Sequence, residues 1–329
     1  MTQSNSSNCC KICNNSFNSE RSLHAHLKKH KISLNEYYFA HYPRKNLLTG
    51  TLLPFKDKES YFENDFETRQ QLIDWCRICE SESPNIVKPY IISLLKQRIE
   101  KKQLKYGPTH LDLETSLMPS IDIYKKHFGS YTEACSAAGV NPLFNKSMTK
   151  EFLNDFSNTE ILIDTREQQP LSFKKQRSFK LDFGDYTCGG SFYNKTYIDR
   201  KSEGDFKSTL VGENLERFRR ELDRCVQLES YLYIVVESSL EKIENSNPFG
   251  AHRANLKFIY HNMRLLQQEY AGYCQFVFSG GRRASTTLIP KLLVLGPKLW
   301  KTDVQYFIDK DNSWLGSKEI KKENLHFAT

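Results

Sequence analysis

The fold of this chain is decided by ILIDTREQQP (161–170), LDFGDYTCGG (181–190) and YIDRKSEGD (197–205). The apolar run that opens the first segment indicates a buried strand, which ends at Asp164 with Glu167 just beyond it. The second segment indicates a turn or strand edge at Asp185. Both segments therefore bring acidic side chains to the end of a strand.

The third segment reads as another strand. Because side chains alternate along a strand, Asp199 and Lys201 share one face and Arg200 lies on the other. Carboxylate oxygens suit Mg²⁺ or Mn²⁺, and a nearby ammonium group can orient water or offset the charge of a phosphate. The sequence therefore predicts acids and one lysine at the rim of a single sheet. A single acid or lysine at a strand end is more often merely solvated. The prediction of a metal site therefore depends on all of these residues occurring together.

The combination resembles the XPF-type nuclease domain of the PD-(D/E)xK superfamily. The signature of that domain is G-D, a spacer, E-R-K, three residues and D. This chain has Gly184-Asp185, then Asp199-Arg200-Lys201, then Asp205 after three residues. Its one departure is Asp199 in place of the usual Glu, which shortens the side chain by one methylene. The broader superfamily accepts either acid.

The resemblance implies a role for each matching residue. Asp164, Asp185 and Asp199 would hold one or two Mg²⁺ or Mn²⁺ ions, with Glu167 as a further ligand or outer acceptor. Lys201 would position the attacking water or stabilise the charge of the transition state. Cleavage would leave a 5′-phosphate and a 3′-hydroxyl.

Residues outside these ligands support the same expectation. Arg200 and Asp205 would brace the strand and the lysine. An amphipathic helix over 213–228, strands at 231–236 and 276–278, and a helix between them complete a restriction-endonuclease-like α/β core over 159–310. Many relatives continue into a tandem helix-hairpin-helix domain, whereas a polar tail (311–329) follows here. A homodimer through the nuclease domain is one candidate assembly.

Composition favours a polyanionic partner. The 329 residues contain 47 Lys and Arg against 39 Asp and Glu, and residues 1–50 hold seven basic residues against two acids. No long apolar run indicates a membrane span or a signal peptide, so the expectation is an intracellular protein. Nine scattered cysteines favour thiols and metal ligands over a disulfide framework.

The N-terminal residues 1–32 have the spacing of a C2H2 zinc finger. The two pairs are separated by twelve residues, and Phe17 and Leu23 occupy the small-core positions; the four ligands are Cys10, Cys13, His26 and His30. Two thiolates and two imidazoles form a closed structural Zn²⁺ site, without which so short a piece would not fold. Cys9 is an alternative to Cys10 as a ligand.

What the finger binds is open between DNA and protein. Its base-reading positions would be Ser19, Ser22 and Ala25, and none of these side chains reads a base strongly. DNA contact would come mostly through phosphates; the basic residues available are Arg21, Lys28, Lys29 and Lys31.

Residues 33–84 form an aromatic-rich connecting segment that is expected to pack or dock. It contains Cys76-x-x-Cys79, read either as ordinary thiols or as a metal or redox site. Residues 85–145 are expected to be helical, and 146–158 to form a hinge.

The run MPSIDIYKKHFGSYTEACSAAGV resembles the repeat associated with homing endonucleases and related phage proteins. The resemblance implies a helix-turn-helix reader in which Ser120 caps a helix that carries Tyr124, Lys125 and Lys126 to DNA. A small helical spacer with surface lysines is the alternative.

The sequence thus predicts a Mg²⁺- or Mn²⁺-dependent endonuclease that acts on double-stranded or branched DNA. The finger and the repeat favour sequence guidance, whereas the catalytic domain favours recognition of DNA structure. A DNA-binding regulator with an inactive nuclease fold is the alternative from another class. The repeat favours a bacterial or phage-infected cytoplasm, and the finger a nucleus; the former is the expectation.

Overall fold

The computed structural model describes residues 8–82, 84–247 and 254–315. Its contacts separate two compact units: residues 1–91 with 116–123, and residues 92–115 with 124–329. The helices expected as one domain over 85–145 are therefore divided between the two units. Of the predicted tail (311–329), residues 316–329 lie outside the described residues.

The first unit begins with a short hairpin and a helix. Its elements are β1 (Asn8–Cys9), β2 (Ser16–Phe17), α1 (Glu20–Leu27), η1 (Lys28–His30), α2 (Leu34–His41), α3 (Lys58–Glu63) and α4 (Arg69–Glu82), and α5 (Pro84–Lys102) begins in it.

The aromatic segment after the finger belongs to the same core. Leu23 and Leu27 of α1 cluster with buried aromatic residues, among which the rings of Tyr38 and Phe55 stack at 3.7 Å between centroids. The phenol oxygen of Tyr37 accepts a hydrogen bond from the backbone N–H of Lys11 at 3.0 Å. The finger residues therefore do not depend on their own few apolar side chains for a core.

The second unit is built on a six-stranded sheet in the order β10-β9-β8-β7-β5-β6. Its strands are β5 (Glu160–Asp164), β6 (Lys175–Phe179), β7 (Tyr186–Cys188), β8 (Thr196–Lys201), β9 (Tyr231–Val236) and β10 (Cys274–Phe278). β7 runs antiparallel to both of its neighbours, and the other five strands run in one direction. The carboxyl ends of these five strands therefore meet at one edge of the sheet.

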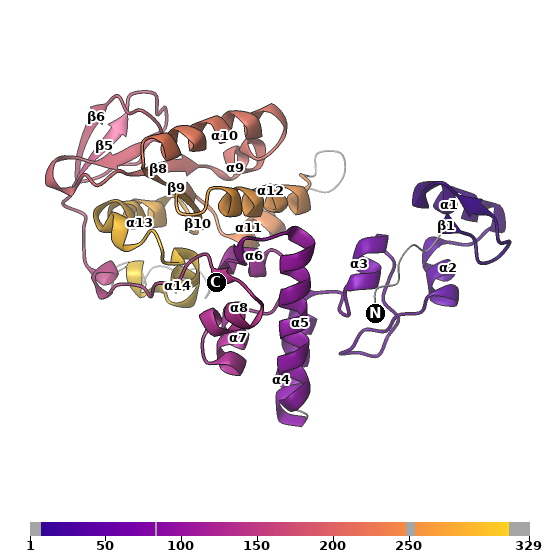
Figure 1. Cartoon of the computed structure of the whole chain (residues 1–329). Helices are drawn as coiled ribbons and strands as arrows, with labels where there is room; N and C mark the ends of the chain where they lie inside the picture. The colour runs from indigo at the N-terminus through magenta and orange to yellow at the C-terminus, as the bar shows by residue number, and fades with distance from the viewer. Residues whose placement is uncertain (1–7, 83, 248–253, 316–329) are drawn as a thin grey trace, which may run out of the picture. The chain divides into compact units, whose positions relative to one another are not determined.

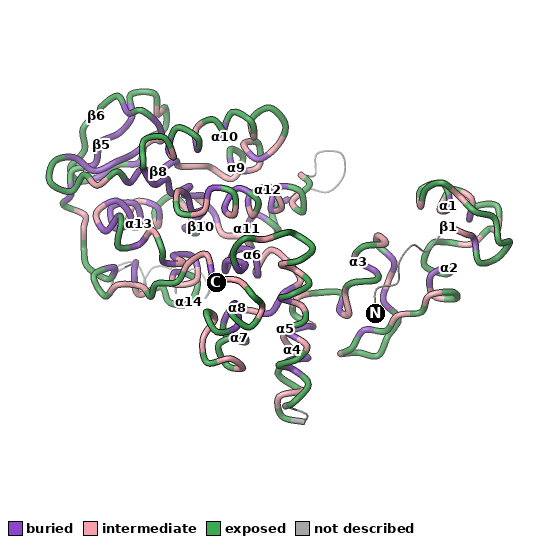
Figure 2. The backbone as a smooth tube through the Cα atoms, viewed as in Figure 1, coloured by how far each residue is buried: buried purple, intermediate pink, exposed green. Residues whose placement is uncertain are grey.

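Helices cover both faces of this sheet (Figure 1). One layer contains α9 (Glu203–Thr209), α10 (Gly212–Gln227), α11 (Leu240–Asn245) and α12 (Leu256–Glu269). The other contains α13 (Arg282–Leu295) and α14 (Val304–Lys310). Burial alternates accordingly along β8, where Tyr197 packs in the first layer and Ile198 in the second. The strands β9 and β10 are buried along their whole length, whereas β6 is exposed throughout (Figure 2). The predicted α/β class is confirmed.

The remaining elements are short. They are β3 (Tyr106–Gly107), α6 (His110–Glu114), α7 (Ile121–Phe128), α8 (Tyr131–Ala137), β4 (Asn141–Pro142), η2 (Lys150–Leu153), η3 (Gly190–Phe192), η4 (Gly296–Lys298) and η5 (Asn312–Leu315). α7 and α8 are joined through Gly129, whose φ of +85° is a conformation that glycine adopts without strain. Among the described helices, none has the length and apolar character needed to cross a bilayer.

Candidate functional site

A cleft of about 610 Å³ opens at the sheet edge where the parallel strands end. Six of its lining residues are acids and three are basic. The acids are Glu167, Asp185, Asp199, Asp205, Glu221 and Glu237, and the basic residues are Arg200, Lys201 and Arg217. The excess of carboxylates favours a bound cation over a bare phosphate.

Asp199 and Lys201 form the centre of the cleft. They are two residues apart on β8, so alternation places them on the same face. Asp199 is 4% exposed, and Lys201 Nζ lies 2.8 Å from its Oδ2 and 5.5 Å from the ring centroid of Phe218. Burial alone would lower the pKa of Lys201. The carboxylates of Asp199, Asp185 and Glu221 outweigh that effect and raise it, so the amine stays protonated.

Asp185 enters the cleft from the turn before β7. Gly184 adopts φ +65°, and a Cβ there would lie 2.9 Å from the carbonyl oxygen of Ile198, so this close approach of two strands requires glycine. The carboxylate of Asp185 accepts a hydrogen bond from the backbone N–H of Arg200 at 2.7 Å. Burial, and then the charge of Asp199, raise the pKa of Asp185 well above its usual range. The site therefore concentrates negative charge that a cation would relieve.

Glu221 of α10 is a cleft acid that the sequence reading missed. Its Oε1 accepts the backbone N–H of Gly184 at 3.1 Å. Burial and the charge of Asp199 raise the pKa of Glu221. The signal was present in the sequence, because Glu221 lies between Phe218 and Leu222 on the apolar face of an amphipathic helix. An acid at such a position must meet a partner inside the fold.

Glu167 and Arg200 belong to a second, adjoining cluster. Arg200 is 7% exposed at its side chain and pairs with Glu167 at 3.1 Å and with Glu237 at 3.0 Å. Burial would lower the pKa of Arg200, but these two carboxylates raise it. Arg282 extends the cluster through Glu237 at 3.3 Å. Arg200 thus joins the ends of β5, β8 and β9, whereas Lys201 faces the cleft acids.

The structure departs from the prediction at Asp164, which does not line the cleft. Its Oδ1 accepts the backbone N–H and the Nε–H of Arg166, both at 2.7 Å. Its Oδ2 accepts Arg166 Nη2 at 3.0 Å and the backbone N–H of Leu181 at 2.7 Å. These donors lower the pKa of Asp164 despite its burial. The carboxylate thus fixes the chain after β5, and its predicted role as a metal ligand stays a prediction.

Asp205 also takes a structural place. It occupies the third position of α9 and forms a reciprocal capping box with Ser202, whose hydroxyl donates to Asp205 Oδ2 at 2.6 Å. The carboxylate therefore fixes the start of α9 directly after β8, and the predicted bracing of Lys201 stays a prediction.

The donor set of the cleft fits a hard divalent ion that keeps part of its water shell. Asp185, Asp199 and Glu221 offer carboxylate oxygens, and the pKa values of Asp185 and Glu221 are raised by burial and by Asp199. Among the described residues, however, the only ligand set within mutual reach of 4.8 Å is elsewhere in the chain. Mg²⁺ is commonly held through one or two carboxylates and several waters, so it does not require all three acids to meet at one point.

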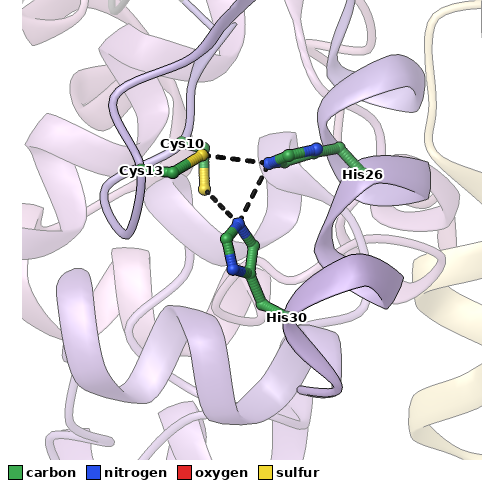
Figure 3. A group of neighbouring side chains, drawn as sticks. All are labelled: Cys10, Cys13, His26 and His30. Atoms are coloured by element: carbon green, nitrogen blue, oxygen red, sulfur yellow. Dashed lines mark hydrogen bonds between the residues drawn. The ribbon is translucent and has the colours of Figure 1, made fainter.

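That closer set is a possible Cys2His2 metal site in the first unit (Figure 3). Cys13 Sγ lies 3.2 Å from His26 Nε2, Cys10 Sγ lies 3.6 Å from His30 Nε2, and the two Nε2 atoms are 3.0 Å apart. Two sulfurs and two imidazole nitrogens fit tetrahedral Zn²⁺. Cys9 lies outside the set, with its sulfur directed to the carbonyl of Asn14 at 3.3 Å. The geometry therefore favours Cys10 over Cys9.

The DNA-binding residues expected in the finger are exposed along one side of α1 and η1. Arg21, Lys28 and Lys29 all reach the surface, and Ser19 caps α1 by accepting the backbone N–H of Ser22.

The residues expected in the helical repeat are placed differently. Ser120 precedes α7, and Lys126 is exposed on it. Tyr124 is fully buried and packs 5.6 Å from the Tyr131 ring, so it is a core residue and not a DNA contact. Lys125 Nζ donates to the hydroxyl of Tyr306 at 2.9 Å.

Cys76 and Cys79 lie in one helix, α4, and belong to no group of three or more metal ligands among the described residues. Cys76 is fully buried, and burial raises the pKa of its thiol to about 12. This favours ordinary thiols over a metal or redox site, because a protonated, buried thiol is neither a good ligand nor a nucleophile.

Parts of two solved structures of an XPF from Aeropyrum pernix align with this chain. The first, a complex with DNA, has 19% identity and a TM-score of 0.33, over 43% of this chain and 66% of that one. The second has 17% identity and a TM-score of 0.32, over 45% and 69%. The chain thus spans less than two thirds of the first structure. No family model and no curated protein matches the sequence.

Proposed function

We propose that the chain is a metal-dependent DNA endonuclease that hydrolyses phosphodiester bonds. The observation that supports this most is the meeting of Asp185, Asp199 and Glu221 with the partly buried ammonium of Lys201 in one cleft. These four side chains come from the turn before β7, from β8 and from α10, and titratable groups gathered in a cleft are typical of functional sites. Burial, and then the charge of Asp199, raise the pKa values of Asp185 and Glu221, and a bound cation would offset that repulsion.

Asp185, Asp199 and Glu221 would hold Mg²⁺ or Mn²⁺, and Glu167 would act as an outer acceptor. Such an ion lowers the pKa of bound water and neutralises phosphate oxygens. Lys201 stays protonated beside Asp199, so it orients the water or stabilises the developing negative charge and does not act as a base. Arg200 holds the strand ends through Glu167 and Glu237, which keeps the backbone N–H that binds Asp185 in place. This set leaves out Asp164, whose carboxylate accepts four hydrogen bonds from Arg166 and Leu181.

The first unit would bring the enzyme to DNA. A Zn²⁺ ion held by Cys10, Cys13, His26 and His30 would fix α1, whose Arg21, Lys28 and Lys29 are exposed for phosphate contact. Lys126 of α7 would add to this contact. The target, double-stranded or branched DNA, follows from the motif resemblance.

The test is plasmid nicking in Mg²⁺ or Mn²⁺ with Asp185→Asn, which keeps the shape of the side chain and removes its charge. We expect loss of cleavage by at least about a hundredfold, with DNA binding in Ca²⁺ preserved. Asp182→Asn is the matched control, because Asp182 is exposed on the same segment. Nicking by Asp185→Asn at the wild-type rate would remove the metal assignment.

One second candidate is a DNA-binding protein whose nuclease fold is inactive, because among the described residues the cleft acids do not form a close group of three metal ligands. The same assay separates the two. An inactive fold gives no nicking above a protein-free control with either metal, whereas the proposed enzyme nicks the plasmid and loses that activity with Asp185→Asn.

A further inference from the structure

The outermost strand β6 has an unusual surface. Its one strand neighbour among the described residues is β5, so its other edge is unpaired. Every residue from Lys174 to Lys180 is exposed. This segment, KKQRSFK, carries four cations and no acid, and the Phe179 side chain within it is 49% exposed. Basic residues interleaved with an exposed aromatic ring are typical of surfaces that bind nucleic acid.

The strand register places one end of this surface at the sheet edge where the cleft opens, with β5 and β7 between β6 and β8. Arg177 pairs with Leu162 of β5, and Phe179 pairs with Asp164, the last residue of β5. Paired residues point to the same face of a sheet, so Lys175, Arg177 and Phe179 lie on the face that Leu162 shares with α10. Phe179 is therefore at the sheet edge where the cleft opens, and Lys175 is furthest from it.

Protection of a sheet edge does not account for this composition. Charged residues on an edge strand, lysine above all, prevent pairing with other chains, so the cations alone would suit protection of the edge. An exposed phenylalanine works against it. Glu160 lies 3.6 Å from Arg177, but both side chains are about half exposed, and such surface pairs are weak. The cations of β6 therefore remain available to a polyanion.

We propose that β6 is a nucleic-acid-binding ledge that leads one DNA strand to the cleft. Lys175 and Arg177 bind phosphates, and Phe179 stacks on a base or sugar next to the acids. Residues two apart on a strand are about 7 Å from each other, which allows contact with successive phosphates. The ledge rests on the proposed function for its substrate, and it supplies the positive charge that the acidic cleft lacks.

The experiment measures binding of fluorescein-labelled single-stranded and duplex oligonucleotides to the full chain by anisotropy over a salt series. Ca²⁺ replaces Mg²⁺, because a chelator would also strip the Cys2His2 site. The variants are Lys175→Ala with Arg177→Ala, Phe179→Ala, and Phe179→Trp. The charge-matched control is Lys298→Ala with Lys301→Ala, which lie by η4, near the start of β10 and away from the cleft edge.

We expect the Lys175/Arg177 variant to reduce the slope of log K against log salt by about 1.4 to 1.8, the loss of two phosphate contacts. Phe179→Ala should weaken single-strand binding roughly tenfold. Phe179→Trp should bind like wild type, and its added fluorescence should be quenched by DNA. Thermal melts should be unchanged in all variants, because these side chains are exposed.

Salt-dependence slopes of the β6 variants equal to those of the control variant would overturn the proposed ledge. A change of the β6 variants in oligomeric state alone would also overturn it and would assign β6 to pairing between protein chains. If wild type cleaves no DNA but the β6 variants bind DNA more weakly than wild type, the ledge is supported and the proposed enzyme is refuted. If wild type cleaves DNA but the β6 variants bind DNA as wild type does, the proposed enzyme is supported and the ledge is refuted.

Discussion

Glu221→Gln should stabilise the protein in the absence of divalent ions. Burial and the charge of Asp199 raise the pKa of Glu221 in the folded state above its ordinary value of 4.5. An acid whose pKa is raised by folding opposes folding when it is ionised, so the penalty is present above the unfolded-state pKa and disappears below it. Gln removes the charge and keeps an oxygen for the N–H of Gly184.

The size of this effect follows from charge repulsion that is partly offset. Two like charges in neighbouring positions repel by a few kcal/mol at an effective dielectric near 20, and the cations Lys201 and Arg224 reduce that. We therefore expect a gain of about 1 kcal/mol at pH 8, which corresponds to a rise in Tm of about 2–4 °C for a unit of this size. The gain should vanish as the pH falls below about 4.5.

Mg²⁺ should reverse the order of the two proteins. A ligand that binds only the folded state raises its stability, so wild type should gain Tm with increasing MgCl₂. Glu221→Gln has lost one carboxylate and should gain less, together with a large loss of nicking. Scanning fluorimetry over pH and MgCl₂ measures both effects. The control is Glu216→Gln on the same helix, whose side chain is 64% exposed. A metal-free Tm at or below wild type, or an unchanged response to Mg²⁺, would refute the reasoning.

Two further outcomes can be measured. His110 Nε2 lies 2.9 Å from Asp309; burial would lower the pKa of His110, but this hydrogen bond and nearby acids raise it. The stabilisation that protonated His110 provides is therefore present below pH 6.5 and lost as the pH rises through the folded-state pKa. His110→Gln should lower the free energy of unfolding, measured by urea denaturation, by about 1 kcal/mol at pH 6 and by less at pH 9. An equal loss at both pH values would contradict this. In the finger, the Co²⁺-loaded protein should show thiolate charge-transfer absorption that Cys10→Ser weakens and Cys9→Ser leaves intact, and the opposite pattern would exchange the two ligands.

Local patterns were sufficient where the relevant contacts are local in sequence. Strand alternation predicts that Asp199 and Lys201 share a face, and they lie 2.8 Å apart. The spacing of the four finger ligands predicts a tetrad, and the tetrad is the closest metal-ligand set among the described residues. For Asp199 and Lys201 one strand fixes the separation. For the finger, each pair of ligands is fixed locally, the cysteines in the turn after β1 and the histidines on α1 and η1.

Position at a strand end did not establish a role for Asp164. Arg166, only two residues on, competes for its carboxylate, and the N–H of Leu181 completes the enclosure. Glu221 was missed for the converse reason, since its partner Gly184 is distant in sequence and only the sheet and α10 bring the two together. Tyr124 shows the same limit on a helix, where a DNA-facing and a core-facing tyrosine have similar patterns.

The division of charge around the cleft has a kinetic consequence. The cleft contains more acids than cations, so it attracts a metal ion and repels a phosphate backbone. Binding energy for DNA must then come from other cations, and the exposed face of β6 offers them beside the same sheet edge. Loss of β6 cations should raise KM and reduce the salt dependence with little change in kcat, whereas neutralising Asp199 should lower kcat at an unchanged salt dependence. If the loss of the β6 cations and the neutralisation of Asp199 changed kcat and KM to the same extent, DNA binding and phosphodiester cleavage would have to depend on the same side chains.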